Sequence, residues 1–417
     1  MQDMTRRSFL RKAALFGASI PAGGLLLEGG TSAVAAAAAT TGEGILICPP
    51  ITTNIYWDGW SAAGKAAAAA LGMSSHYENF NGDTTRQVAS FQNMATLGLK
   101  GAMTMANVAG ASPRLAQICQ KQNVYLVNCH NNQPWVTPLD VGDYYYQYLE
   151  FANDDAFEAL CTFLFKKMGE TGKVIHISGT AGVSASDYRD IGFKRALQKF
   201  PKIQLLATAY GNFGRVATVP IVENLLTAHP DVQAIICQND DSGMGAISVL
   251  KKKGIKAYVV GCDGVPEFLD AISAGDALAT IGNTGIWLGG GMAVRLFDAN
   301  NGVKLHPLER MQHFEVFVIN TPEAAQAFKA LQTGENPYDF KKMSRFLHPD
   351  DWDMQTALTQ IRPDIEWGPF ASQAPHGYKL PSPYQDASAE YDRLDAMYRD
   401  HLKSDPFDAI KKLCTQS

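Results

Sequence analysis

The chain has 417 residues, of which 46% are hydrophobic and 18% are charged, and its formal net charge is −5. This balance is typical of a globular protein and gives no electrostatic basis for binding nucleic acid. The length exceeds what a single hydrophobic core usually supports, so we expect two domains.

The first 39 residues have the pattern of a twin-arginine export signal. Arg6 and Arg7 precede a weakly apolar run at 13–27 and a small-residue cleavage candidate at 33–35. A basic, disordered N-terminus is the alternative, but the order of these features favours a signal at 1–39. The apolar run is short and rich in glycine, so we expect no stable membrane insertion. The pattern predicts that the twin-arginine (Tat) machinery exports a folded chain into the periplasm.

The seven cysteines show no CxxC spacing. Cys48, Cys237 and Cys262 lie within or at the ends of apolar runs, where cysteine usually acts as a small core residue. We therefore expect neither a disulfide framework nor a metal site. Because no glycine-rich phosphate loop is present either, we expect no cofactor.

From residue 44 to about 310, apolar strand-like runs alternate with helical segments. In the first half we expect strands at 45–48, 76–79, 101–105, 125–128 and 144–148, and helices at 60–71, 84–97 and 112–122. The pattern restarts at 153–155, with strands at 173–177, 203–206, 232–237, 258–261 and 279–283, and helices at 156–168, 186–200 and 220–228. The expected fold class is α/β, with two doubly wound, Rossmann-like lobes.

Residues 232–263 contain the first candidate site. A buried strand at 232–237 is followed by Asn239, and the next strand, at 258–261, is followed by Asp263. In open α/β sheets, ligands bind outside the carboxyl ends of neighbouring parallel strands. Both side chains also have structural interpretations. Asp263 could begin a type I turn, and Asn239 could bond its own turn while Asp240 caps the following helix.

Residues 223–240, ENLLTAHPDVQAIICQND, closely resemble the corresponding stretch of bacterial ribose-binding protein and its relatives. These are the periplasmic sugar-binding proteins of ABC importers, which have the type I periplasmic-binding fold. The resemblance extends over about 44–320 and includes VVGCDG at 259–264, TIGN at 280–283 and the pair Gly192-Phe193.

The resemblance implies that three crossovers form a hinge between the lobes. These fall near 148–153, 283–285 and 303–312. The N-terminal lobe would then comprise 43–149 plus 284–310, and the C-terminal lobe 150–283 plus 311–322.

The resemblance also implies a ligand site for a sugar or polyol between the lobes. Burying such a ligand requires aromatic walls for its C–H faces, and carboxylate or amide groups for its hydroxyls, because an unpaired buried hydroxyl costs about 1–3 kcal/mol. The residues implied are Asn54, Tyr56 and Trp57 on the first wall, Phe213 on the opposite wall, and Asn239, Asp263 and Asn283 as hydroxyl partners.

The sequence departs from the sugar-binding family at two places in this site. Where the family has an acidic–basic pair, this chain has Cys129 and His130. The family's ligand-contacting arginine aligns with Asp187, while Arg189 aligns with a second, structural arginine. We therefore add His130 and Asp187 to the candidates and expect a less cationic site, suited to a tetritol, a pentitol, a cyclitol, or a pentose or hexose other than ribose.

The last part of the chain, 323–417, continues beyond the usual end of the family. We expect a strand at 314–320, a helix starting at 321–323, and a charged helix at 387–402. The aromatic residues between 352 and 384 argue against disorder. We expect this C-terminal extension to pack along one lobe or the hinge.

The predicted function is that of an extracytoplasmic solute-binding protein, not an enzyme. It would capture a carbohydrate or polyol by hinge closure and deliver it to the permease of an ABC importer. One alternative is a ligand-sensing partner of a chemoreceptor or sensor kinase. Another is an exported carbohydrate-active enzyme in which Asp187 and Asp263 form a carboxylate pair. A repressor of the same fold is not expected, since the chain begins with an export signal in place of a helix-turn-helix.

Overall fold

The computed structural model describes residues 43–51, 55–282 and 285–415. All of them lie within one unit of packing, residues 39–417. The expected export signal and the site candidates Asn54 and Asn283 lie outside the described residues.

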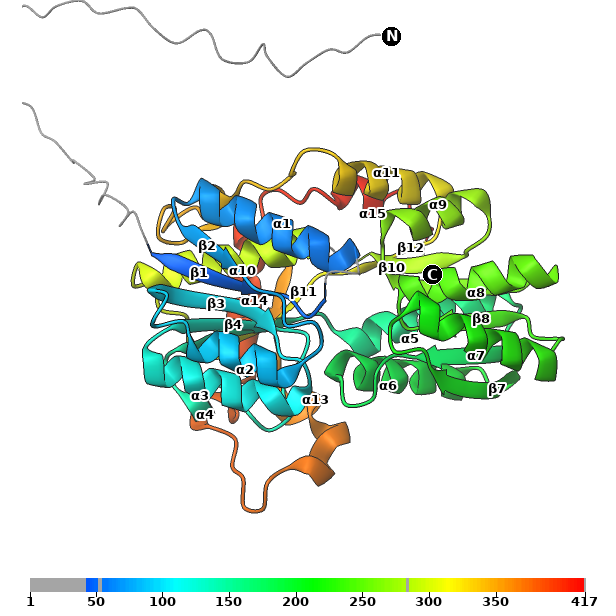
Figure 1. Cartoon of the computed structure of the whole chain (residues 1–417), viewed down its shortest axis with the longest axis horizontal. Coiled ribbons are helices and arrows are strands. Elements are labelled where there is room, and N and C mark those ends of the chain that lie inside the picture. The colour runs from blue at the N-terminus through cyan, green and yellow to red at the C-terminus, as the bar shows by residue number, and fades with distance from the viewer. Residues whose placement is uncertain (1–42, 52–54, 283–284, 416–417) are drawn as a thin grey trace, which may run out of the picture. The chain divides into compact units, whose positions relative to one another are not determined.

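The first lobe is built on a seven-stranded sheet with the order β13-β11-β5-β4-β3-β1-β2. Figure 1 shows β1, β3 and β4 of this sheet between α1 on one side and α2 and α3 on the other. All neighbouring strands are parallel except β11 and β13. The strands are β1 (Gly44–Cys48), β2 (Ser74–Tyr77), β3 (Leu99–Met105), β4 (Tyr125–Cys129), β5 (Tyr145–Glu150), β11 (Met311–Phe314) and β13 (Leu358–Gln360).

Alternate residues of β1 belong to different hydrophobic clusters. Ile45 and Ile47 pack with α1 and α10, whereas Leu46 and Cys48 pack with α2 and α3. Since successive side chains of a strand point to opposite faces, both faces of the sheet are covered by helices, as a doubly wound lobe requires. The helices are α1 (Ile55–Ala70), α2 (Thr84–Gln92), η1 (Ala109–Ala111), α3 (Ser112–Gln122), α4 (Pro138–Val141), α10 (Gly285–Asn300) and η2 (Pro307–Arg310).

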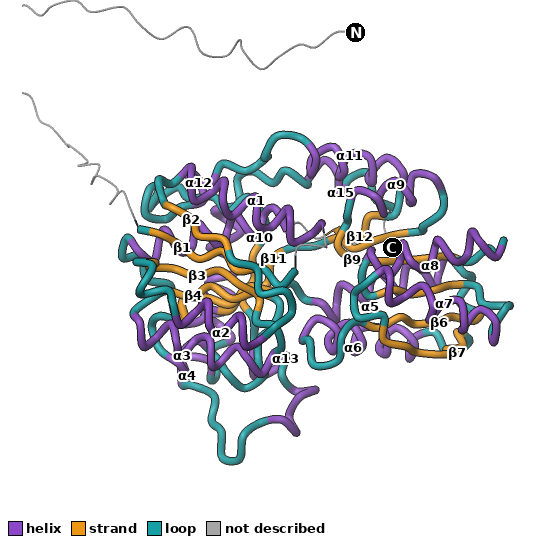
Figure 2. The backbone as a smooth tube through the Cα atoms, in the orientation of Figure 1, coloured by secondary structure: helices purple, strands orange, loops and turns teal. Residues whose placement is uncertain are grey.

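The second lobe is built on a six-stranded sheet with the order β12-β10-β9-β8-β6-β7, and Figure 2 shows both sheets in orange between helices. Only β12 is antiparallel to its neighbour. The strands are β6 (Gly172–Ser178), β7 (Ile203–Tyr210), β8 (Ala234–Cys237), β9 (Tyr258–Asp263), β10 (Ala279–Gly282) and β12 (Phe317–Ile319), and the helices are α5 (Asn153–Lys167), α6 (Ser184–Lys199), α7 (Arg215–Ala228), α8 (Asp240–Lys253) and α9 (Pro266–Ala274).

The connections between the sheets correct one expected boundary. The first described crossover runs from β5 to α5 through 151–152, and the connection from β10 to α10 lies outside the described residues. β11, expected in the C-terminal lobe, pairs with β5 in the first sheet, with Met311 opposite Tyr148. The third crossover therefore lies at 315–316, later than the expected 303–312. The run FEVFVI at 314–319 contains no glycine, proline or asparagine, so it resembles one strand, although its two ends belong to different sheets.

The C-terminal extension contacts both lobes, where we expected one lobe or the hinge. α11 packs against α9, α12 against α1 and α10, α14 against β13, and α15 returns to α11. Its helices are α11 (Pro322–Thr333), α12 (Phe340–Met343), α13 (Pro363–Glu366), η3 (Gly368–Gln373), η4 (Ser382–Tyr384), α14 (Ser388–His401) and α15 (Asp408–Lys411).

Six of the seven cysteines are buried, and none of the seven forms a disulfide. Burial raises the pKa of the Cys48 thiol to about 12, so it stays protonated and apolar in character. In the part of the chain that the structure describes, no helix has both the length and the apolarity needed to cross a bilayer.

Candidate functional site

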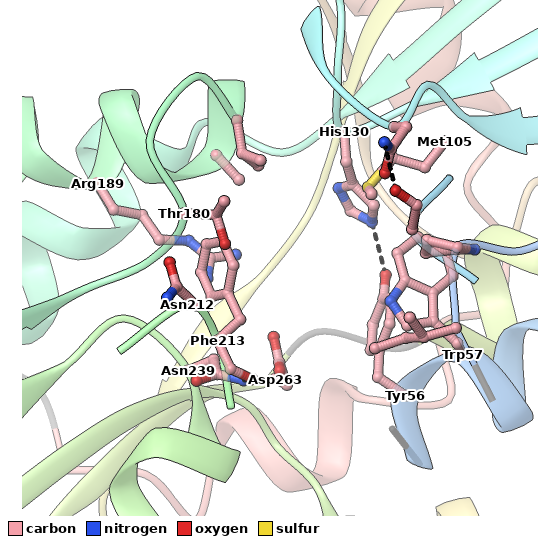
Figure 3. A pocket seen from close by; sticks show the side chains of 16 residues that line it. Tyr56, Trp57, Met105, His130, Thr180, Arg189, Asn212, Phe213, Asn239 and Asp263 are labelled. Atoms are coloured by element: carbon pink, nitrogen blue, oxygen red, sulfur yellow. Dashed lines mark hydrogen bonds between the residues drawn. The ribbon is translucent and has the colours of Figure 1, made fainter. Parts of the chain in front are cut away.

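A cavity of about 240 Å³ is lined by residues from both lobes (Figure 3). Its volume is below the roughly 300–1,000 Å³ of sites for drug-sized ligands, so a smaller molecule would fit. The lining residues lie at or just beyond the carboxyl ends of β1, β2, β3, β4, β6, β7, β8 and β9, or in the first two turns of α1 and α6. Six of the predicted site residues lie on this cavity: Tyr56, Trp57, His130, Phe213, Asn239 and Asp263.

Tyr56, Trp57 and His130 form the first-lobe wall. The Tyr56 hydroxyl lies 2.8 Å from His130 Nε2. The rings of Tyr56 and Trp57 meet edge to face with centroids 5.2 Å apart. Both aromatic residues are 8–9% exposed and belong to the core cluster as well as to the cavity. Each of these two residues therefore packs in the core with one part of its side chain and lines the cavity with another.

Phe213 forms the opposite wall from the loop between β7 and α7. Asn212 and Phe213 have φ angles of 52° and 54°. These values lie in the left-handed region, which residues other than glycine rarely adopt. The ring of Phe213 lies over Gly179, where a β-carbon would come within 2.0 Å of the ring. The loop thus holds an aromatic face toward the cavity, and the strain fits a functional position.

Asp263 lies at the end of β9 with a φ of 125°. The next residue, Gly264, has a φ of 70° where a type I turn requires about −60°, so Asp263 does not begin such a turn. Its partly buried position raises the pKa of its carboxyl to about 7, although the charge of Arg189 opposes the shift. A carboxyl group that is poorly solvated and faces a cavity can accept hydrogen bonds from ligand hydroxyls.

Asn239 lines the cavity and also caps α8. Its Oδ1 accepts the N–H of Ser242 at 3.1 Å, and its Nδ2 donates to the Phe213 carbonyl at 3.0 Å. The expectation that Asp240 caps this helix is wrong. Asp240 is buried inside the lobe, where its carboxyl accepts the N–H of Val265 at 2.9 Å and the Thr280 hydroxyl at 2.7 Å. Burial and the neighbouring Asp263 raise its pKa well above the usual range.

Arg189 lines the cavity, whereas Asp187 does not. Asp187 lies on a separate cavity of about 330 Å³ beside Phe370 of the extension. The Nε of Arg189 donates to Asn153 Oδ1 at 2.8 Å, its Nη1 donates to the Gln238 carbonyl, and its guanidinium lies 5.7 Å from the Phe213 ring centroid. Residues two apart on a helix point in nearly opposite directions, which is why only one of this pair can face the cavity.

Four further polar or flexible lining residues were not predicted: Met105, Asn107, Thr180 and Asn212. Asn107 follows β3 as Asn239 follows β8, so it could have been selected in the same way, as a polar residue just beyond the carboxyl end of a strand. Its side chain donates to the Gly82 carbonyl and the Thr84 hydroxyl, both at 2.8 Å. Asn212 sits in the same loop as Phe213, where asparagine tolerates a left-handed backbone.

The chemistry of the cavity suits a neutral, hydroxylated molecule. Aromatic rings face it from both lobes, and amides and one carboxyl supply hydrogen bonds. The charge of Arg189 is already engaged by protein oxygens. The enzyme alternative requires Asp187 and Asp263 as a carboxylate pair, but Asp263 is the one acidic residue among the described lining residues of this cavity.

The family model described as "periplasmic binding protein domain" matches residues 45–300, which is more than half of the chain. The chain therefore belongs to the periplasmic binding protein family.

Known relatives bind small sugars and sugar alcohols. The ribose import binding protein of Escherichia coli (strain K12) is 42% identical over 120 residues, covering 28% of this chain and 40% of that protein. The D-allose-binding periplasmic protein of the same strain is 26% identical over 273 residues, covering 63% of this chain and 86% of that protein. The xylitol-binding protein of Mycolicibacterium smegmatis (strain ATCC 700084 / mc(2)155) is 32% identical over 131 residues, covering 31% of this chain and 38% of that protein. The chain thus spans about two fifths of the ribose- and xylitol-binding relatives.

Solved structures share the fold. A twin-arginine translocation pathway signal protein from Burkholderia phytofirmans has a TM-score of 0.66 and 24% identity, covering 69% of this chain and 92% of that chain. An ABC transporter solute-binding protein from Actinobacillus succinogenes 130z with bound D-allose has a TM-score of 0.63 and 18% identity, covering 68% of this chain and 99% of that chain.

Proposed function

We propose that this chain is an extracytoplasmic solute-binding protein that captures a neutral sugar or sugar alcohol and delivers it to an ABC importer. The observation that carries the proposal is the cavity itself. Tyr56 and Trp57 face it from one lobe and Phe213 from the other, with Asp263 and Asn239 beside them. Aromatic faces contact the C–H surfaces of such a ligand, and the carboxyl and amide groups pair with its hydroxyls.

Capture proceeds by closure of the lobes around the ligand. In this structure the lobes already touch beside the cavity, since the Ser184 N–H donates to Asn131 Oδ1 at 2.7 Å and its hydroxyl donates to the Asn132 carbonyl at 3.1 Å. A ligand that bridges both walls stabilises this contact and shifts an open–closed equilibrium by its preference for the closed state. The permease of the importer then recognises the closed form.

The family of binding proteins and the pattern of residues 1–39 together support export by the Tat machinery to the periplasm. The twin-arginine signal protein from Burkholderia phytofirmans, which shares the fold, is consistent with this route. An export assay in which Arg6 and Arg7 are both replaced by lysine tests it: the chain should remain in the cytoplasm, and unchanged export would contradict the route.

A thermal-shift screen of pentoses, hexoses, pentitols and cyclitols tests the ligand class. A bound ligand raises the melting temperature, because it stabilises only the native state. A shift with an acidic or basic solute, and none with any neutral polyhydroxylated compound, would contradict the proposal.

A further inference from the structure

A buried polar chain leads from the cavity wall to the hinge. The Tyr56 hydroxyl lies 2.8 Å from His130 Nε2, and His130 Nδ1 lies 2.9 Å from Glu150 Oε1. Both His130 and Glu150 are 3–5% exposed. Glu150 is the last residue of β5, where the chain crosses to the second lobe. It does not line the ligand cavity, and no sequence pattern marks it as a site residue.

The Glu150 carboxyl determines which nitrogen of His130 carries the proton. Its Oε1 also accepts the Phe151 N–H at 2.9 Å, so this oxygen is an acceptor for both groups. His130 Nδ1 must then carry a hydrogen. In the neutral ring, Nε2 is left as the acceptor for the Tyr56 O–H.

The surroundings of His130 leave the ring few other ways to bond. It lies among the rings of Tyr56, Trp57, Phe151 and Phe314, with centroids 5.8–6.4 Å away. Its backbone has a φ of 57°, a strained value for a residue other than glycine. These aromatic neighbours cannot fix the tautomer of His130, so Glu150 is the group that selects the tautomer and orients the ring.

The second oxygen of Glu150 has no described hydrogen-bond partner. Glu150 Oε2 and His313 Nδ1 are both buried without a hydrogen-bond partner among the described residues. These two residues are opposite each other in the pairing of β5 and β11, and both line a cavity of about 20 Å³. That volume holds a single water, which would satisfy both atoms. The other nitrogen of His313 lies 2.7 Å from Glu366 Oε2 in the extension.

We propose that Glu150 is a positioning residue for the ligand site. It holds His130 in the Nδ1–H tautomer that accepts the Tyr56 hydroxyl, and one buried water shared with His313 connects it to β11 and, through Glu366, to the extension. The predicted effect of Glu150 on ligand affinity rests on the proposed function, whereas its predicted effect on the His130 tautomer does not. This series of hydrogen bonds holds the first-lobe wall, the end of β5 and β11 in one arrangement.

The first test is NMR of the imidazole nitrogens in the ligand-free protein, with the His130 signals assigned from a His130→Gln variant. The wild type should show His130 with a hydrogen on Nδ1. A neutral ring with its hydrogen on Nε2 would overturn the proposal. This readout needs neither a ligand nor a substitution at Glu150, so it stands even if no solute in the panel binds.

Two variants of Glu150 separate positioning from packing. Glu150→Gln keeps an acceptor oxygen and should retain the tautomer and an affinity within about threefold of the wild type. Glu150→Met keeps the volume but removes the acceptor, and should lose the tautomer and weaken affinity by about tenfold or more. Glu78→Gln is the control, since Glu78 faces His76 at 3.9 Å on the surface. A Met variant with the wild-type tautomer and affinity would overturn the proposal.

A crystal structure at high resolution tests the water. The expected density is one water within hydrogen-bond distance of both Glu150 Oε2 and His313 Nδ1. An empty cavity there would overturn the proposed water-mediated contact between Glu150 and His313.

Discussion

The ring of Phe213 lies directly over the backbone of Gly179, so closely that a β-carbon on Gly179 would come within 2.0 Å of the ring's Cζ atom. Gly179 follows β6 and Phe213 follows β7, and these strands are neighbours in the second sheet. The aromatic wall of the second lobe therefore depends on a glycine that does not itself line the cavity.

Gly179→Ala should displace the Phe213 ring and weaken ligand binding by about tenfold, with a loss of about 1–3 kcal/mol in the free energy of unfolding from overpacking. Calorimetric titration and urea unfolding measure the two effects. Gly368→Ala is the matched control, because nothing lies within 4 Å of its β-carbon position. Equal affinities for the two variants would show that the ring position does not matter.

Asp263 and Asp187 give opposite predictions, although the alignment with the family made both of them candidates. Asp263→Ala should reduce affinity by about a hundredfold or more, if the carboxylate accepts two ligand hydroxyls at about 1.5–3 kcal/mol each. Asp187→Ala should change affinity by less than about threefold, since its side chain lies on a different cavity. Calorimetry on both variants decides this, and a large effect at Asp187 would place the ligand elsewhere.

The raised pKa of Asp263 predicts a pH-dependent contribution to stability in the absence of ligand. The unfolded carboxyl titrates near pH ~3.9, whereas in the native protein its pKa is about 7. Between these values the native state binds more protons than the unfolded state, so the Asp263 contribution to stability decreases as pH rises from ~4 to ~7. Urea unfolding of the wild type and Asp263→Asn at several pH values measures it. The variant should gain stability relative to the wild type across this window, and parallel profiles would contradict the assigned pKa.

Phe370 attaches the extension to both lobes. Its carbonyl accepts the Trp135 Nε1–H at 2.8 Å, and its ring meets Tyr188 of α6 with centroids 5.0 Å apart. Phe370→Ala should lower the free energy of unfolding by about 2–4 kcal/mol, because the ring is almost fully buried. Ile365→Ala nearby should cost little, since Ile365 is 65% exposed. If urea unfolding gave the same small change for both, the extension would not brace the lobes.

The sequence predicted those parts of the site that follow from strand ends. Asn239 and Asp263 end neighbouring parallel strands, and the strand order brings their side chains to one edge. The choice between Asp187 and Arg189 could not be made in this way, because it depends on the rotation of α6 about its axis. The family alignment selected Asp187, whereas Arg189 lines the cavity. The packing of α6 against α5, where a β-carbon on Gly192 would meet the Asp154 carbonyl at 2.1 Å, fixes that rotation.

Long-range pairing was the other part that the sequence did not reveal. β11 ends at Phe314 and β12 begins at Phe317, yet the former pairs with β5 and the latter with β10. Glu150 was missed for the same reason, since its partners His130 and His313 are brought to it only by β4 and β11. A local pattern predicts that a strand exists, but not which sheet it joins.

Calorimetric titration of the wild type and of Asp263→Ala with neutral pentoses, hexoses, pentitols and cyclitols tests the central claim most directly. The account predicts that at least one of these compounds binds the wild type at one site per chain, and that Asp263→Ala removes most of that affinity. Binding that is unaffected in Asp263→Ala, or a panel in which no compound binds the wild type, would contradict it.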